Sequence, residues 1–193
     1  MKDERTELRE RRTASTKTYE NPDHSFTKEI YLSPVHYQTE DGSWEEMDDT
    51  LTDVETPSET ENAVEKTQKK AADASAFINR KGRWQASFAA YADSESAITI
   101  KDGSHHTISW HLEQAASSEA CRKDTQVLVY PEILPGIDAE YHTAGQAVKE
   151  NLILKGAAQV PEQFSFLYHA EGLSALQHGN QVTFEDADGK EVF

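Results

Sequence analysis

Residues 98–112 read ITIKDGSHHTISWHL, and this stretch decides the fold class. In 98–101 apolar and polar side chains alternate, as they do in a strand with one buried face. The Asp-Gly pair at 102–103 is a strong hairpin signal. Alternation resumes in 107–112, where isoleucine, tryptophan and leucine share one face. The stretch therefore predicts two antiparallel strands joined by a turn.

Similar short runs recur on both sides of this hairpin, separated by turn dipeptides such as Asp41-Gly42, Pro135-Gly136 and Asp188-Gly189. No helical period of useful length follows residue 75, and turn signals every 8–12 residues or so are typical of sandwiches. We therefore predict an all-β fold, an antiparallel β-sandwich. Further local expectations are a strand pattern that Val35 and Tyr37 resume after a break at 33–34, a strand over 126–130 ended by Pro131, and a central strand at 152–154, which is apolar on both faces.

The first part of the chain differs from the rest. Residues 1–25 carry six basic and six acidic side chains, which predicts a charged segment, either a short exposed helix or a frayed tail. Residues 26–193 are assigned to the sandwich domain. Within them 52–75 contain no aromatic residue and no sustained apolar period, so a long polar loop or linker is expected there.

The net charge of −16 is carried almost wholly beyond residue 25. Such a field repels phosphate backbones and anionic lipid heads, so we expect no nucleic-acid partner and no direct membrane insertion. No apolar run approaches the roughly 18 residues that a transmembrane helix needs. The first twenty residues do not resemble a secretory signal, so a signal for export is expected upstream. A single cysteine excludes an internal disulfide.

No sequence motif for catalysis is present, so the sequence predicts no catalytic residue, no cofactor and no metal ligand. His105 and His111 fall on one strand face but roughly 20 Å apart, too far to share an ion. The acidic residues at 45, 46, 48 and 49 could collect a hard cation, although a solvated strand face is the default interpretation. Cys121 lies beside two cations, without a histidine close in sequence.

The three tryptophans allow two interpretations. Trp44, Trp84 and Trp110 could form a stacking platform for sugars, and they are the candidate glycan-contact residues. Each also occupies an inward-looking position of an alternating strand, where core packing is the usual role of tryptophan. An exposed row of aromatic side chains would favour the glycan-binding interpretation, and buried tryptophans would favour the core-packing interpretation.

Three ordered stretches carry a family resemblance: 7–19 (ELRERRTASTKTY), 34–48 (PVHYQTEDGSWEEMD), and 129–150, which contains VYPEI, GIDAEY and VKE. In this order they resemble the N-terminal β-rich region of bacterial wall-associated proteins with Rhs or YD repeats. Those are large secreted polypeptides that often carry DNRLRE-type carbohydrate-binding modules. The resemblance covers nearly the whole chain and is weakest between 52 and 95.

The resemblance implies a secreted or cell-surface location and a long parent protein, and it supplies no catalytic residues for this region. We therefore expect a non-enzymatic structural or interaction module, whose partners are other domains of the same polypeptide and cell-wall glycan. The first alternative is a dedicated carbohydrate- or cell-wall-binding module. The second is a hydrolase whose triad assembles only in space.

Overall fold

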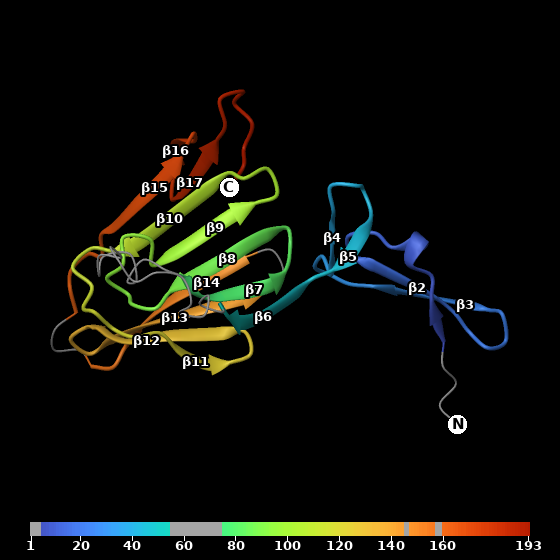
Figure 1. Cartoon of the computed structure of the whole chain (residues 1–193), viewed down its shortest axis with the longest axis horizontal. Coiled ribbons are helices and arrows are strands. Elements are labelled where there is room, and N and C mark those ends of the chain that lie inside the picture. Colours follow the sequence, from blue (N-terminus) through green and yellow to red (C-terminus); the bar gives the residue numbers. More distant parts are fainter. Residues whose placement is uncertain (1–4, 55–74, 145–146, 157–159) are drawn as a thin grey trace, which may run out of the picture.

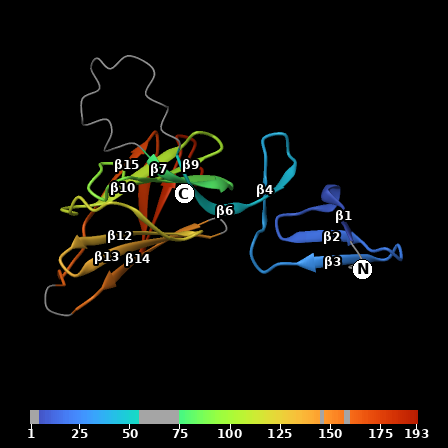
Figure 2. The same cartoon turned by 60° about the horizontal axis from the view of Figure 1, so that its bottom comes forward.

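The computed structural model describes residues 5–54, 75–144, 147–156 and 160–193, and their architecture is all-β. Two antiparallel sheets lie face to face (Figure 2). One has six strands in the order β15-β10-β9-β8-β7-β6, and the other has four in the order β11-β12-β13-β14. This confirms the predicted antiparallel β-sandwich. The strands of the two sheets are β6 (Asp48–Asp53), β7 (Ser75–Lys81), β8 (Trp84–Ala89), β9 (Ile98–Asp102), β10 (Thr107–Leu112), β11 (Cys121–Asp124), β12 (Val127–Leu134), β13 (Ile137–Ala144), β14 (Ala147–Leu154) and β15 (Phe166–Glu171).

A second, smaller body lies beside the sandwich, and we call residues 5–47 the N-terminal lobe (Figure 1). Its elements are β1 (Thr6–Glu7), a 3-10 turn η1 (Arg9–Arg11), β2 (Thr16–Glu20), β3 (Phe26–Ile30), β4 (His36–Gln38) and β5 (Trp44–Glu46). The first three strands form one sheet, and β4 and β5 form a hairpin. The chain enters the sandwich through β6. At the other end β16 (Ser174–His178) and β17 (Gln181–Glu185) form a separate hairpin.

The expected boundary at 25/26 falls between β2 and β3, which pair along their whole length. The described part of the charged segment contains two short strands and one 3-10 turn rather than a longer helix. The expected polar loop at 52–75 overlaps the ends of β6 and β7, and its residues 55–74 lie outside the described ranges. In the described part of the chain, no helix is long and apolar enough to cross a membrane.

The hairpin of β9 and β10 forms at the predicted place, with Ile98 opposite Trp110. Its turn is longer than two residues. The Asp102 carboxylate accepts backbone N–H bonds from Ser104 at 2.9 Å and from His106 at 2.8 Å. His105 takes the left-handed conformation, with φ of 70°. The aspartate therefore organises this turn through its side chain.

Inward-facing side chains of both sheets form one core. The six-stranded sheet contributes Phe88 and Ile98, and the four-stranded sheet contributes Leu128, Tyr130 and Tyr141. Phe88 and Leu128 are 0% exposed. Burying each large apolar side chain stabilises a fold by about 1.5–3 kcal/mol, so this core holds the two sheets together.

Two local expectations are wrong, one about the place of a strand in its sheet and one about where a strand ends. The segment at 152–154 is not central, because β14 is an edge strand on which Ile153 and Leu154 are 42% and 50% exposed. The strand predicted to end at Pro131 continues to Leu134. A register shift follows Tyr130, where proline cannot donate to the ladder, and the chain resumes pairing at Leu134.

The deepest burial in 35–37 falls on the residue between the two apolar ones. His36 is 0% exposed, whereas Val35 and Tyr37 are only half-buried. Because side chains of a strand alternate between its two faces, His36 points to the face opposite Val35 and Tyr37. The lobe thus buries the imidazole more deeply than the apolar side chains on either side of it.

Candidate functional site

The interior of the N-terminal lobe is polar. Among residues 5–47, the three that are less than a tenth exposed are Arg12, Thr18 and His36. Large apolar residues of β3 and the following turn face outward instead, Ile30 at 77% and Leu32 at 107% exposure. Because apolar burial is the main favourable term in folding, this lobe depends on hydrogen bonds and ion pairs to an unusual degree.

Arg12 joins two parts of the lobe. Its Nε and Nη2 donate to the two carboxylate oxygens of Glu7, each at 2.8 Å, and Nη1 donates to the Trp44 carbonyl at 3.2 Å. The guanidinium thus ties β1 to the hairpin of β4 and β5. These hydrogen bonds hold the pKa of Glu7 below its usual value, so its carboxylate is ionised at neutral pH.

His36 lies beside this pair, at the start of β4. Its Nδ1 donates to the Thr13 carbonyl oxygen at 2.7 Å, since a carbonyl can only accept. Its Nε2 is buried and has no hydrogen-bond partner. One ligand atom each of Glu7, His36 and Glu46 lie within 4.8 Å of one another.

Glu46 completes the cluster from the end of β5. Lys17 of β2 donates to its Oε1, and this hydrogen bond lowers the pKa of Glu46. Arg12 Nη2 lies 3.7 Å from the same oxygen. The side chain of Glu46 is 51% exposed, so the cluster opens to solvent on this side. We call Glu7, Arg12, Lys17, His36 and Glu46 the lobe cluster.

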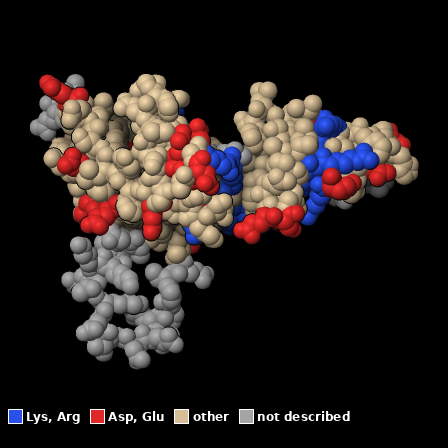
Figure 3. All heavy atoms as spheres, turned by 90° about the horizontal axis from the view of Figure 1, so that it is seen from above, with Lys and Arg blue, Asp and Glu red and all other residues tan. Residues whose placement is uncertain are grey.

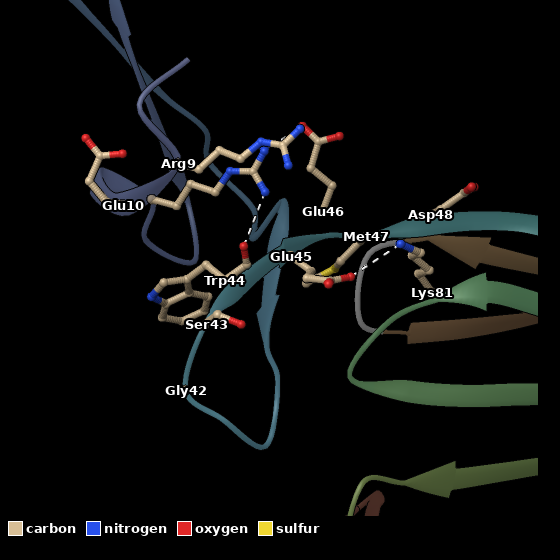
Figure 4. Close-up of a pocket in the computed structure, with 11 residues that line it drawn as sticks. Arg9, Glu10, Gly42, Ser43, Trp44, Glu45, Glu46, Met47, Asp48 and Lys81 are labelled. Atoms are coloured by element: carbon tan, nitrogen blue, oxygen red, sulfur yellow. Dashed lines mark hydrogen bonds and ion pairs between the residues drawn. The ribbon is translucent and has the colours of Figure 1, made fainter.

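A hollow of about 760 Å³ adjoins the lobe cluster, between the lobe and the sandwich. Figure 4 shows Trp44 on the lobe side and Lys81 of β7 on the sandwich side. Lys81 Nζ donates to Glu45 across the hollow at 3.3 Å. Lys and Arg gather over the lobe and at its junction with the sandwich on the face in Figure 3. Glu45 and Glu46 are ion-paired, and Arg80 lies 3.5 Å from Asp48, while the side chains of these three acids remain between 36% and 51% exposed.

The three tryptophans lie in two different bodies. Trp84 and Trp110 pack against the cluster of Ile100, Ile108 and Phe184 in the sandwich. Trp110 Nε1 donates to Glu150 at 3.3 Å. Trp44 belongs to the lobe and lines the hollow. The structure therefore brings Trp84 and Trp110 to one apolar cluster and leaves Trp44 apart from both.

Other groups singled out from the sequence have local roles. His106 Nδ1 lies 3.0 Å from the Asp102 carboxylate in the β9–β10 turn, and His111 Nδ1 contacts the Glu95 carbonyl at 3.0 Å. Cys121 is exposed on β11. The lobe cluster has no sequence signature, because Glu7 lies in one stretch and His36 and Glu46 lie ten residues apart in another, without a known metal-ligand spacing.

Comparison with known proteins found curated relatives of low identity. The chain is 27% identical over 199 residues to the tRNA nuclease WapA of Bacillus subtilis strain 168, which covers 97% of this chain and 8% of that protein. A tRNA(Glu)-specific nuclease WapA from Bacillus subtilis subsp. natto is 27% identical over 194 residues, with the same coverage. A wall-associated protein of Geobacillus stearothermophilus is 26% identical over 203 residues, covering 97% of this chain and 71% of that protein. No family model and no solved structure matches.

These names contradict two expectations drawn from the sequence. Three relatives that match 97% of the chain are named tRNA nucleases, which overturns the expectation of a protein without enzymatic activity. The same names overturn the expectation that nucleic acid is excluded as a partner. Both expectations rested on the absence of sequence motifs and on net charge, which describe this stretch of chain only.

The chain spans 8% of the length of the nucleases it matches, so their names describe proteins much longer than the stretch compared. A relative of more similar length is named only for its association with the wall. The comparisons support a family of wall-associated proteins, found at the cell wall or cell surface.

Proposed function

We propose that the chain is a structural and interaction module of a large secreted, wall-associated protein of the Rhs/YD-repeat type. Its role is to pack against neighbouring parts of the same polypeptide at the cell surface. The names of the relatives support the wall-associated setting, and the small share of the nucleases that the chain spans supports a longer polypeptide. The order of motifs at 7–19, 34–48 and 129–150 supports the repeat-protein type.

The observation that carries the packing role is an apolar edge on each sheet. β14 ends the four-stranded sheet and exposes Ile153 and Leu154 at 42% and 50%. β15 ends the six-stranded sheet and exposes Leu167 and Tyr168 at 51% and 58%. A strand edge with free backbone groups and large apolar side chains is a template for pairing with further chain.

Hydrogen exchange compares the 193-residue chain with a longer polypeptide that includes its natural neighbouring segments. We expect slower exchange in β14 and β15 of the longer protein, because covered edges lose access to solvent. Edge strand β11 is the matched control, since its four residues, CRKD, are exposed and three of them are charged. Unchanged exchange in β14 and β15 contradicts the packing role.

We also infer that the longer polypeptide cleaves tRNA, as the names of the nuclease relatives indicate for those proteins. The test is incubation of the purified longer polypeptide with total tRNA, followed by gel analysis of the tRNA species. Loss of one or a few species supports the inference. A complete tRNA population after prolonged incubation overturns it.

A second candidate function is binding of wall glycan at the hollow, and Trp44 is the observation that favours it. The indole lines the hollow together with charged side chains, a combination that suits sugar rings and their hydroxyls. Co-sedimentation with cell-wall sacculi tests this, with Trp44→Ala against Tyr168→Ala as a control on the sandwich. Selective loss of binding in Trp44→Ala supports it, and equal binding by both variants removes it.

A further inference from the structure

His36 carries a buried ring nitrogen that nothing in the described protein satisfies. The side chain is 0% exposed, and Nε2 has no hydrogen-bond partner. Because Nδ1 donates to the Thr13 carbonyl, the neutral ring presents Nε2 as a lone pair. Buried polar atoms without partners are rare, and each one requires an explanation. A histidine whose other nitrogen donates to a backbone carbonyl is also the usual arrangement of a metal ligand.

Two carboxylates lie beside this ring. One ligand atom each of Glu7, His36 and Glu46 lie within 4.8 Å of one another. A point central to three such atoms is at most about 2.8 Å from each, compared with 2.0–2.2 Å for zinc bound by histidine nitrogen or carboxylate oxygen. The difference is less than about 1 Å per ligand, which a half-exposed side chain such as Glu46 can supply by a small rotation.

We propose that Glu7, His36 and Glu46 form a divalent transition-metal site, with Zn²⁺ as the best-matched ion. One imidazole nitrogen and two carboxylate oxygens are a ligand set that zinc accepts, and water from the adjoining hollow supplies the fourth position. The ion would link β1 to both strands of the β4–β5 hairpin. This inference does not depend on the proposed function.

A metal ion that joins these strands would stabilise a lobe whose composition provides little apolar burial. Residues 5–47 have no apolar side chain below a tenth exposure, and bodies of about 40 residues usually need disulfides, metals or partners to be stable. The chain has one cysteine, at position 121, so a disulfide cannot serve. A metal would supply what the polar interior lacks.

The two cations of the lobe cluster have different consequences for the ion. Arg12 uses both oxygens of Glu7, but a carboxylate has about four lone-pair sites, so it can accept Arg12 and bind a metal together. Lys17 contacts Glu46 Oε1 and must give up that contact or share it. With His36 neutral, the charges of Glu7, Glu46, Arg12 and Lys17 cancel, so the cluster offers a dication no net attraction until Lys17 moves away. Lys17 therefore competes with the metal.

The experiment is calorimetric titration of the chelator-treated 193-residue chain with ZnCl₂ at neutral pH. We expect one saturable site that Glu46→Gln weakens at least tenfold and Lys17→Met tightens several-fold. Glu45→Gln is the matched control, because it removes the same charge one residue away and should leave zinc affinity unchanged. The ¹⁵N shift of His36 Nε2 on zinc addition reports the histidine directly without a variant that could misfold.

The results separate this site from adventitious binding to an acidic protein. Equal weakening by Glu45→Gln and Glu46→Gln, or an unmoved His36 signal at saturation, overturns the proposal. Absence of stoichiometric zinc binding also overturns the proposal, and a metal ion then does not explain the unpaired Nε2 of His36. Weaker zinc binding in Lys17→Met contradicts the competition that the geometry requires.

Discussion

Replacing Arg12 by glutamine should loosen the N-terminal lobe selectively. The substitution removes both hydrogen bonds to Glu7 and the bond to the Trp44 carbonyl. The side chains of Arg12 and Glu7 are 7% and 19% exposed, so the change leaves a largely buried carboxylate without its cation. Exposed ion pairs contribute about 0–1 kcal/mol, and breaking a buried one costs about 3–5 kcal/mol. A partly buried pair near a lobe surface falls between them, at about 2 kcal/mol.

Hydrogen exchange under native conditions measures this loss locally. A fall of about 2 kcal/mol in the opening free energy speeds exchange about 30-fold, at 1.4 kcal/mol for each factor of ten. We expect that acceleration in peptides covering Leu8, directly after β1, and β4, because Leu8 N–H and His36 N–H bond to the carbonyls of Thr18 and Ala14. Peptides of β12 and β13 in the sandwich should exchange as in the wild type.

Arg5→Gln is the matched control. Arg5 also pairs with a glutamate, Glu29, but the two side chains are 42% and 31% exposed. Solvent screens such a pair, so its loss should not measurably change exchange in the lobe. The reasoning is refuted if Arg12→Gln and Arg5→Gln accelerate exchange equally, or if the sandwich opens as much as the lobe.

Two further predictions concern the sandwich. Tyr130→Phe removes a buried donor that lies 2.7 Å from the Ala89 carbonyl, so it should cost about 1–2 kcal/mol in urea unfolding. Exposed Tyr168→Phe should change stability by less than about 0.5 kcal/mol, and equal effects of the two changes would contradict this interpretation. Burial raises the pKa of the Glu150 carboxyl above its unfolded value of about 4.5. The protonated carboxyl therefore stabilises the fold fully below the unfolded pKa, and this stabilisation is lost as pH rises through the folded pKa. Wild type should therefore gain stability relative to Glu150→Gln as pH falls from 7 to 4, and parallel urea-unfolding profiles would show that the sign is wrong.

The β class could be predicted because it depends on local patterns. Apolar alternation in 98–101 and 107–112 placed β9 and β10 correctly, and their Asp102 turn lies between them. These signals depend on residues that are neighbours in the sequence. They do not depend on which sheet faces which.

Exposure and register could not be predicted because they depend on distant contacts. The apolar run at 152–154 could not reveal that no strand covers β14 among the described residues. The burial of His36 could not be predicted, because a buried imidazole requires a polar environment, and Glu7 supplies part of it from a distant part of the chain. A polar core gives no hydrophobic signal, so the lobe cluster emerged only from the structure.

A protein that resembles wall-associated proteins should be accessible at the surface of the cells that produce it. The most direct test uses antibodies raised against the purified 193-residue chain on intact cells that produce the protein. We expect labelling of intact cells and recovery of the antigen in the wall fraction, from which digestion of the wall releases it. Antigen found only after lysis, in the fraction of soluble internal proteins, would contradict it.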